Sequence, residues 1–291
     1  MIKMIALLLI ASAVCHAGWN IIAKGAKDKL TFLWCQIVFA AAVMTVPVLL
    51  FCPAPKPEGY IFLAISGIMQ AAYYFLLAKT YSIGEISVVY PLTRGSAPVF
   101  VCLFSALMGT ENITLPVFLS VLMIFAGIYT VNMKKFSAEE FAAPIKTLAK
   151  VPQTHLALLN GLIVAAYTLS DSRSVGYCDP LMIYWVIAVI PAVLLAPMII
   201  KRGRLSEEIK CGKFRIAAVS LLTFAAYFLV LTAMKHAGAS YVSAVREMSV
   251  IFVAVYSAAK LKESLPASKI AGSVMIFSGI VLLSYFSEKI S

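Results

Sequence analysis

The stretch "AAYYFLLAKTYSIG" at residues 71–84 returns in altered form as "AAYFLVLTAMKHAG" at residues 225–238. A second pair of similar stretches follows the same order: "MIFAGI" at residues 123–128 and "MIFSGI" at residues 275–280. The first pair is offset by 154 residues and the second by 152. Two matches at nearly one offset indicate that the chain contains two copies of a single unit.

Charged residues strengthen this interpretation, because apolar helices use few residue types and match easily by chance. The offset of 152 residues aligns Arg94 with Arg246 and Glu111 with Glu263. Two extra residues between Gly84 and Arg94 in the first copy reconcile the two offsets. We therefore interpret the sequence as an internal duplication.

The composition indicates a membrane protein. The chain has 291 residues, of which 62% are hydrophobic and 13% charged, whereas soluble domains carry roughly 25% charged residues. Eight long stretches contain no acid or base, and each is long enough to cross ~30 Å of hydrocarbon as a helix. Two further apolar stretches, about residues 86–110 and 237–260, are interrupted by charges. These patterns predict an all-α polytopic membrane protein with ten transmembrane helices.

Five helices per copy is an odd number, so the second copy starts from the opposite side of the membrane. The expected arrangement is two inverted five-helix repeats, at residues 1–133 and 154–291, an arrangement that many secondary transporters use. Between them, residues 134–153 are interpreted as a linker with a short amphipathic helix on the membrane surface. An unstructured linker is the alternative.

Basic residues concentrate on one side of this arrangement. Of the 24 Lys and Arg, five fall on the side of the termini and seventeen on the other, while Arg94 and Arg246 lie within spans. Because basic loops stay in the cytoplasm, we predict that both termini lie outside the cytoplasm of a bacterial inner membrane. The first apolar run continues past Trp19 toward Lys24, which favours an uncleaved span over a signal peptide or a lipoprotein start at Cys15.

Arg94 is the first candidate for chemistry, because a charged side chain near the centre of a span costs at least ~2.5–3.5 kcal/mol. Its guanidinium suits a carboxylate or phosphate group. Pro91 and Pro98 remove helix hydrogen bonds on both sides of it, which predicts an irregular, gating helix. Snorkelling of the side chain to the membrane surface is the alternative.

Arg246 is the repeat equivalent of Arg94 and is expected to bind the same acidic group of a substrate. Glu247 follows it and points about 100° away on a helix, so each residue needs its own partner. Glu247 is a candidate for a substrate amine or a coupling proton. A structural ion pair to another helix is the alternative.

Further candidate residues occupy matching spans. His16, which could carry a proton, shares a helix face with Trp19 and Asn20. In the second copy Asp171 aligns with Asn20, and it is a further proton-coupling candidate. The remaining candidates are aromatic residues that could line the same cavity, for which core packing is the equal alternative: Tyr74, Tyr167 and Tyr227. The sequence shows no convincing spacing of metal ligands, and no metal or cofactor is expected.

The chain resembles an EamA-type member of the drug/metabolite transporter superfamily. The motifs that carry the resemblance run through nearly the whole chain: "HAGWN" at 16–20, "YPLTRG" at 90–95, "MGTE" at 108–111, "AAYTLSD" at 165–171, "AVRE" at 244–247 and "KLKE" at 260–263. The resemblance implies ten spans around a central cavity lined by spans one, three, four, six, eight and nine. Members of this kind of family move small metabolites or drugs and commonly export them.

These observations predict a secondary active transporter of an amino acid-like zwitterion or organic anion, working by alternating access, linked to protons and directed outward. A flippase for a lipid-linked headgroup is the alternative. A membrane-embedded enzyme is less favoured, because it would need an acid/base or metal cluster that the sequence does not show. The expected partners are a small-molecule substrate, protons and membrane lipids, with no nucleic acid. The sequence leaves substrate identity and oligomeric state open.

Overall fold

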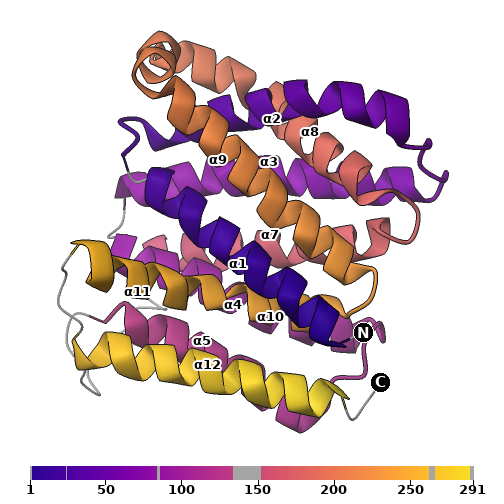
Figure 1. Ribbon diagram of the computed structural model, residues 1–291, viewed down its shortest axis with the longest axis vertical. Coiled ribbons are helices and arrows are strands. Elements are labelled where there is room, and N and C mark those ends of the chain that lie inside the picture. Colours follow the sequence, from indigo (N-terminus) through magenta and orange to yellow (C-terminus); the bar gives the residue numbers. More distant parts are fainter. Residues whose placement is uncertain (1, 24, 84–85, 134–151, 262–265, 289–291) are drawn as a thin grey trace. The chain divides into compact units, whose positions relative to one another are not determined.

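The computed structural model of the protein, drawn in Figure 1, describes residues 2–23, 25–83, 86–133, 152–261 and 266–288. These residues form helices joined by turns and short connections, and no strand occurs among them. The predicted linker at 134–153 lies outside the described residues except for its last two positions, which begin a helix.

The helices in chain order are α1 (Ile2–Ala23), α2 (Lys29–Phe51), α3 (Gly59–Ile83), α4 (Ile86–Leu107), α5 (Leu115–Val131), α7 (Pro152–Ser174), α8 (Pro180–Arg202), α9 (Leu205–Met234), α10 (Ala239–Arg246), α11 (Met248–Leu261) and α12 (Ala267–Glu288). Local sequence sets several of these ends. Asp28 and Asp179 cap α2 and α8 by accepting a hydrogen bond from the backbone N–H two residues on. Gly203 ends α8 in the left-handed conformation, with φ of 68°.

Seven helical stretches among the described residues are long and apolar enough to cross a membrane, judged by length and composition: Lys3–Ala23, Lys29–Phe51, Gly59–Leu77, Pro180–Arg202, Gly212–Met234, Ala239–Tyr256 and Ala267–Ser287. Shorter apolar stretches lie in α4 and α5. Helix α7 belongs to neither group, and it buries polar side chains such as Asn160 and Asp171. A multi-pass, all-helical chain is confirmed for the described residues, whereas the count of ten spans stays a prediction.

The chain divides into two compact units, and each takes segments from both halves of the sequence. Unit 1 comprises residues 1–75 and 167–237, and unit 2 comprises residues 76–166 and 238–291. The repeats are continuous segments of the sequence, whereas each unit combines two separate segments that pack together. The units therefore do not test the predicted boundaries of the repeats. Helices α3 and α7 each contribute to both units.

In unit 1, α1 packs against α9, and α2 packs against both α8 and α9 (Figure 1). Polar side chains bond across these contacts instead of facing lipid. Ser12 Oγ on α1 donates to the carbonyl of Ala226 on α9 at 2.7 Å. Trp34 Nε1 on α2 donates to the carbonyl of Ala192 on α8 at 2.9 Å. Such bonds satisfy polar groups that the bilayer cannot satisfy.

In unit 2, α5 lies along α12 with their backbones in close approach (Figure 1). Glycines make this possible: a Cβ on Gly127 would lie 2.8 Å from the carbonyl oxygen of Gly272, and one on Gly279 would lie 3.0 Å from that of Ser120. Small residues at helix contacts are the usual way in which membrane helices approach each other. Helix α4 packs against α5 and α10 in the same unit.

Candidate functional site

Unit 2 contains a buried ion pair that joins the two predicted arginine-bearing spans. Arg94 Nη2 on α4 lies 3.2 Å from Oε1 of Glu247. The two residues are only 8% and 4% exposed. Burying two charges is costly and is tolerated when they pair with good geometry. Snorkelling of Arg94 to the surface does not occur here, because the side chain is enclosed within the unit.

Glu247 occupies a break in the helix of the second copy. Helix α10 ends at Arg246, Glu247 forms its C-cap, and α11 starts at Met248. The backbone N–H of Glu247 bonds to the carbonyl of Ala244, as in a tightened last helical turn. The interruption therefore places a charged side chain at the junction of two helices.

The prolines of the first copy do not produce a matching break. Helix α4 runs without interruption from Ile86 to Leu107, through both Pro91 and Pro98. A proline costs one N–H donor, and a membrane helix tolerates this loss where neighbouring groups satisfy the freed carbonyl. Pro98 is buried, and the side chain of Pro91 lies outside the described part of the chain. Helix α4 is thus continuous across residues 91–98, whereas the second copy is interrupted at Glu247, and the gating role of the two prolines stays a prediction.

Besides the hydroxyl of Ser240, two buried polar groups of unit 2 have no hydrogen-bond partner among the described residues. One is the second carboxylate oxygen of Glu247, Oε2, and the other is the whole side-chain amide of Asn160 on α7. Next to Arg94, Thr93 on α4 donates to the carbonyl of Ala157 on α7 at 3.2 Å. Gly161, the neighbour of Asn160, also faces α4 at Thr93 and Ser96. Helix α7 therefore carries a buried, unsatisfied amide one residue from its contact with α4.

Asn160 was not among the residues predicted from the sequence. Its signal was an amide inside the apolar run "LLNGLIV" at residues 158–164. A buried polar group without a partner is costly, so its presence in a packed unit favours a role with a ligand or water. Arg246, the repeat equivalent of Arg94, is also buried in unit 2.

Unit 1 holds a second buried acid, Asp171 near the end of α7, which is 0% exposed. Ser66 Oγ on α3 donates to its Oδ1 at 2.5 Å, and the hydroxyl of Tyr227 on α9 donates to its Oδ2. The adjacent Ser170 donates to the carbonyl of Phe62 at 2.8 Å. Asp171 thus joins three helices through hydroxyl groups. We name Ser66, Asp171 and Tyr227 the Asp171 cluster, of which Ser66 was missed from sequence.

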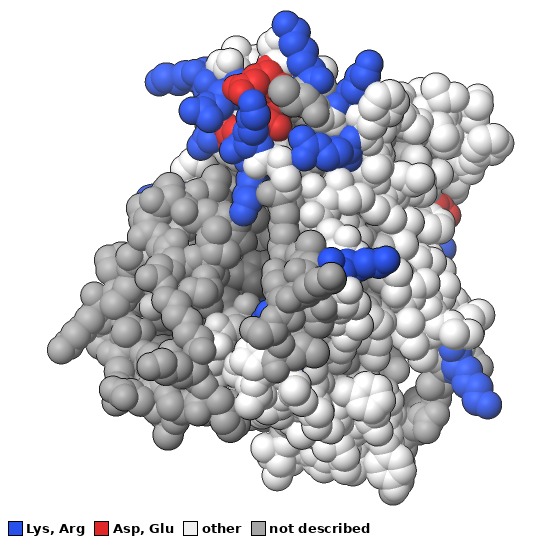
Figure 2. Space-filling view, turned by 60° about the vertical axis from the view of Figure 1, so that its left-hand side comes forward, with Lys and Arg blue, Asp and Glu red and all other residues white. Residues whose placement is uncertain are grey.

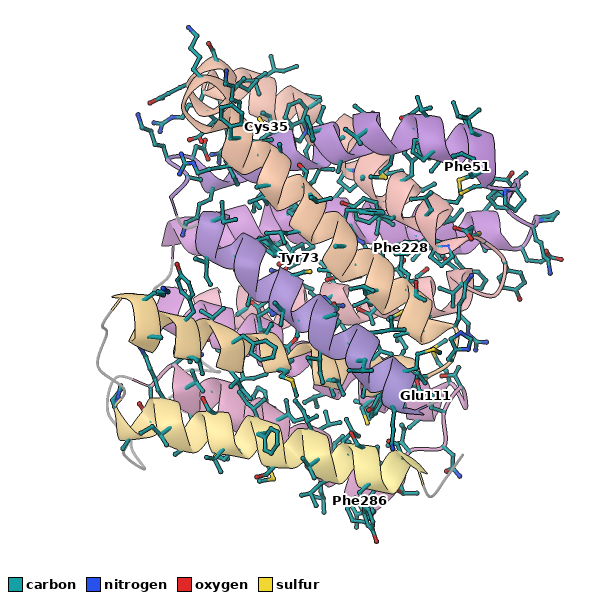
Figure 3. The ribbon with its side chains drawn as sticks, in the orientation of Figure 1. Cys35, Phe51, Tyr73, Glu111, Phe228 and Phe286 are labelled. Atoms are coloured by element: carbon teal, nitrogen blue, oxygen red, sulfur yellow. The ribbon has the colours of Figure 1, made fainter. Side chains whose placement is uncertain are left out.

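The other aromatic candidates of unit 1 pack close by. Tyr73, labelled in Figure 3, meets the rings of Tyr74 and Tyr167 edge-on, with centroids 5.3 and 6.1 Å away. Edge-to-face contacts at these distances stabilise aromatic clusters. Tyr74 also packs against an apolar group made of Ile37, Ala41 and Ala188. Within unit 1, therefore, Tyr74 and Tyr167 have clear packing partners.

The three candidates on α1 contact one another. Trp19 Nε1 donates to Nδ1 of His16 at 3.2 Å, and the amide of Asn20 donates to the carbonyl of His16 at 2.8 Å. Trp19 also packs against an apolar group that includes Phe32 and Val219. The bond from Trp19 requires the neutral form of His16 at Nδ1. All three residues are half-buried.

The described residues contain no group of three or more His, Cys, Asp or Glu placed to hold a metal ion. The candidate binding and proton-coupling residues are divided between the two units. Unit 2 contains Arg94, Arg246 and Glu247. Unit 1 contains His16, Trp19, Asn20, Tyr74, Tyr167, Asp171 and Tyr227. The arrangement in unit 2 offers fixed charges of both signs, and that in unit 1 offers an acid held by hydroxyl groups.

A family model described as the EamA-like transporter family matches residues 3–133 and again residues 154–285. A solved structure described only as the crystal structure of a protein is similar to this chain, with a TM-score of 0.74 over 99% of this chain and 98% of that chain. Its sequence identity is 14%, so the likeness shows the fold alone. No curated protein matches the sequence.

Proposed function

Because the chain belongs to the EamA-like transporter family of the drug/metabolite transporter superfamily, we propose that it is a secondary active transporter with ten spans that works by alternating access. The proposed substrate is a small amino acid-like zwitterion or organic anion, exported in exchange for protons across a bacterial inner membrane. The Arg94–Glu247 pair carries this proposal.

The pair has the chemistry that a zwitterion needs. The guanidinium of Arg94 can bind a carboxylate through two parallel hydrogen bonds. The carboxylate of Glu247 can accept from an ammonium group, and its Oε2 has no hydrogen-bond partner among the described residues. A zwitterion that enters between the two side chains replaces one buried ion pair with two, so no charge is left without a partner.

Proton coupling follows from competition at Glu247. A proton on the carboxylate removes its negative charge and so weakens its attraction for the substrate ammonium. Glu247 can therefore bind either the substrate or a proton, but not both at once. This competition is what the exchange of substrate for protons requires. The Asn160 amide, buried on α7 of the same unit, is proposed to take part in substrate binding through its unused donor and acceptor atoms.

Counterflow in proteoliposomes tests this proposal. Vesicles with purified protein are loaded with a mixture of amino acids. The entry of each amino acid is measured by its radiolabel, and proton movement is measured by a pH-sensitive dye inside the vesicles. We expect one or more amino acids to exchange with protons. Glu247→Gln should abolish substrate-driven proton movement and weaken binding about tenfold or more.

Glu207→Gln is the matched control, because Glu207 is an exposed acid outside the spans. This variant should behave like the parent protein. Unchanged proton coupling in Glu247→Gln would reject the mechanism. Movement of a lipid-linked headgroup without transport of any soluble substrate would favour the flippase alternative.

A further inference from the structure

One end of unit 1 is held together by polar contacts between the α1–α2 loop and the α8–α9 corner, which we define as residues 200–215. Lys27 Nζ lies 2.9 Å from Oε1 of Glu207. Arg202 Nη1 donates to both carboxylate oxygens of Asp28, at 3.2 and 3.1 Å. The N–H of Asp28 donates to Glu208 at 2.6 Å. The loop and the corner thus form one connected surface.

In these contacts, each of the three acids of this surface bonds to another group of the same surface. Glu207 pairs with Lys27, Asp28 pairs with Arg202, and Glu208 is buried against the backbone of the loop. Four further bases of the corner are exposed and take part in none of the ion pairs that the structure describes: Lys201, Arg204, Lys210 and Lys213. The surface therefore presents an excess of positive charge to its surroundings.

Figure 2 shows basic side chains gathered around acidic ones at the upper end of the face it displays, where Figure 1 places the start of α9. This end lies where the candidate spans stop. One span ends at Arg202 and the next begins at Gly212. The exposed bases therefore stand at the level where a bilayer changes from hydrocarbon to headgroups.

Apolar side chains are exposed beside these bases. Phe214 is 81% exposed, the highest value among the large hydrophobic side chains that the structure describes, and Ile200 and Ile209 are also exposed. Lys213 Nζ lies 5.2 Å from the centre of the Phe214 ring. An aromatic anchor next to basic side chains is typical of surfaces that lie in the interface of an anionic membrane.

We propose that the α8–α9 corner binds the headgroup of an anionic phospholipid of the surrounding bilayer. Lys210 and Lys213 would bind the lipid phosphate, and Phe214 would lie among the upper parts of the acyl chains. Charge complementarity favours this occupant, because each Lys or Arg near an anionic leaflet contributes about a fivefold gain in affinity. The apolar anchor favours a lipid over a free anion, since a soluble phosphate gains nothing from Phe214.

Native mass spectrometry of the purified protein, titrated with phosphatidylglycerol or phosphatidylcholine, tests the proposal. The parent protein should bind phosphatidylglycerol more tightly. The double variant Lys210→Gln/Lys213→Gln should lose about fivefold in that affinity for each lysine removed. The matched control is Lys56→Gln/Lys235→Gln, which removes two exposed bases elsewhere in unit 1, one of them beyond the opposite end of α9. It should bind like the parent.

Two outcomes would overturn the proposal directly: equal affinity of the parent for both lipids, or equal loss in the test and control variants. Soluble glycerol phosphate separates the two possible sources of the phosphate. Competition by glycerol phosphate at the same concentration as the lipid would assign the site to a free anion and reject the membrane lipid. Circular dichroism of each variant confirms that these surface changes leave the fold intact.

Discussion

The two copies of the chain differ at the residue that follows their buried arginine. Arg246 is followed by Glu247, whereas Arg94 is followed by Gly95, where a Cβ would lie 2.7 Å from the ring of Phe125. The acid of the second copy pairs with the arginine of the first, but the first copy has no acid at the equivalent position to return this contact. The two arginines are therefore not equivalent, although the repeat aligns them.

The Arg94–Glu247 pair should be coupled in stability. Arg94→Gln leaves Glu247 buried without this cation, so we expect a loss of about 3–5 kcal/mol in the free energy of unfolding. Adding Glu247→Gln should recover most of the loss, because two neutral amides bury no unpaired charge. Melting temperatures of the purified single and double variants in one detergent measure both effects.

The control for this pair is Lys27→Gln/Glu207→Gln, whose side chains are 60% and 50% exposed. Exposed ion pairs contribute little, so its melting temperature should stay close to that of the parent. The coupling is absent if Arg94→Gln melts like this control, or if the double variant at Arg94 and Glu247 melts no higher than Arg94→Gln alone.

Asp28 should make the α1–α2 loop sensitive to acid. Burial raises its pKa, but hydrogen bonds from Arg202 and Thr31 and the charge of Arg202 outweigh this, so the pKa of Asp28 is lowered. A carboxyl whose pKa is lowered by folding stabilises the fold above its unfolded pKa of about 4, and this stabilisation is lost as the pH falls through the folded value. Asp28→Asn keeps a capping residue but removes the charge.

Asp28→Asn should therefore melt below the parent at pH 7, and the gap should close as the pH falls below about 4. Asp28→Ala also removes the cap and should lose a further ~1 kcal/mol at every pH. Melting curves of the three proteins across this pH range measure both terms. A gap between parent and Asp28→Asn that stays constant with pH would show that the charge of Asp28 does not contribute.

The helix contacts within each unit pair helices that are equivalent in the two predicted repeats. Helices α2 and α8 are equivalent in the two copies and pack together, as do α5 and α12. The contact of α1 with α9 has its counterpart in the bonds between α7 and α3. The motif glycines Gly127 and Gly279 both lie in the α5–α12 contact. These helices and their glycines could be predicted from the sequence. Their packing partners could not, because an apolar pattern shows which part of a helix is buried but not which other helix covers it.

Gly127 should be the position where α5 tolerates a side chain least. Gly127→Ala places a Cβ 2.8 Å from the carbonyl oxygen of Gly272, so the backbones must separate, and we expect a loss of about 1–3 kcal/mol. Gly18→Ala in α1 is the control, because its nearest neighbour is a flexible Leu222 side-chain atom at 3.4 Å. Alanine favours the helix by up to ~1 kcal/mol there. Equal melting temperatures for the two variants would contradict close α5–α12 packing.

At the scale of the whole chain, composition and spacing predicted an all-helical membrane protein, and the described residues confirm it. The candidate site was less predictable. Arg94, Glu247 and Asp171 stand out in apolar sequence because charge is rare there. Ser66 does not, because hydroxyl groups are common in such helices and matter only through what they face. Asn160 carries a weaker signal, a neutral amide in an apolar run, and its burial without a partner follows only from the packing. The break at Glu247 carries no proline or glycine, so its sequence signal was the pair of charges that interrupts this apolar stretch.

The orientation of the chain in the membrane is the last prediction. The end of α1, the start of α2, the end of α8 and the start of α9 meet through the contacts of Lys27 and Asp28, so these four ends lie on one side of the membrane. That side carries most of the bases and is therefore expected to be cytoplasmic. Residue 2, at the other end of α1, then lies outside, and an even count of ten spans places Ser291 outside as well.

Reporter fusions test this orientation. A phosphatase active only outside the cytoplasm, or a fluorescent protein that matures only inside it, is inserted after Gly203, inserted after Lys56, or fused to Ser291. Gly203 suits an insertion, because it ends α8 and no atom lies within 4 Å of the position that a Cβ would take. The Gly203 fusion should fluoresce, and the Lys56 and Ser291 fusions should show phosphatase activity. Fluorescence from Ser291 with fluorescence from Gly203 would require an odd number of spans. Fluorescence from Ser291 with phosphatase activity at Gly203 would instead invert the whole chain, and the basic corner of α8 and α9 would then face away from the cytoplasm.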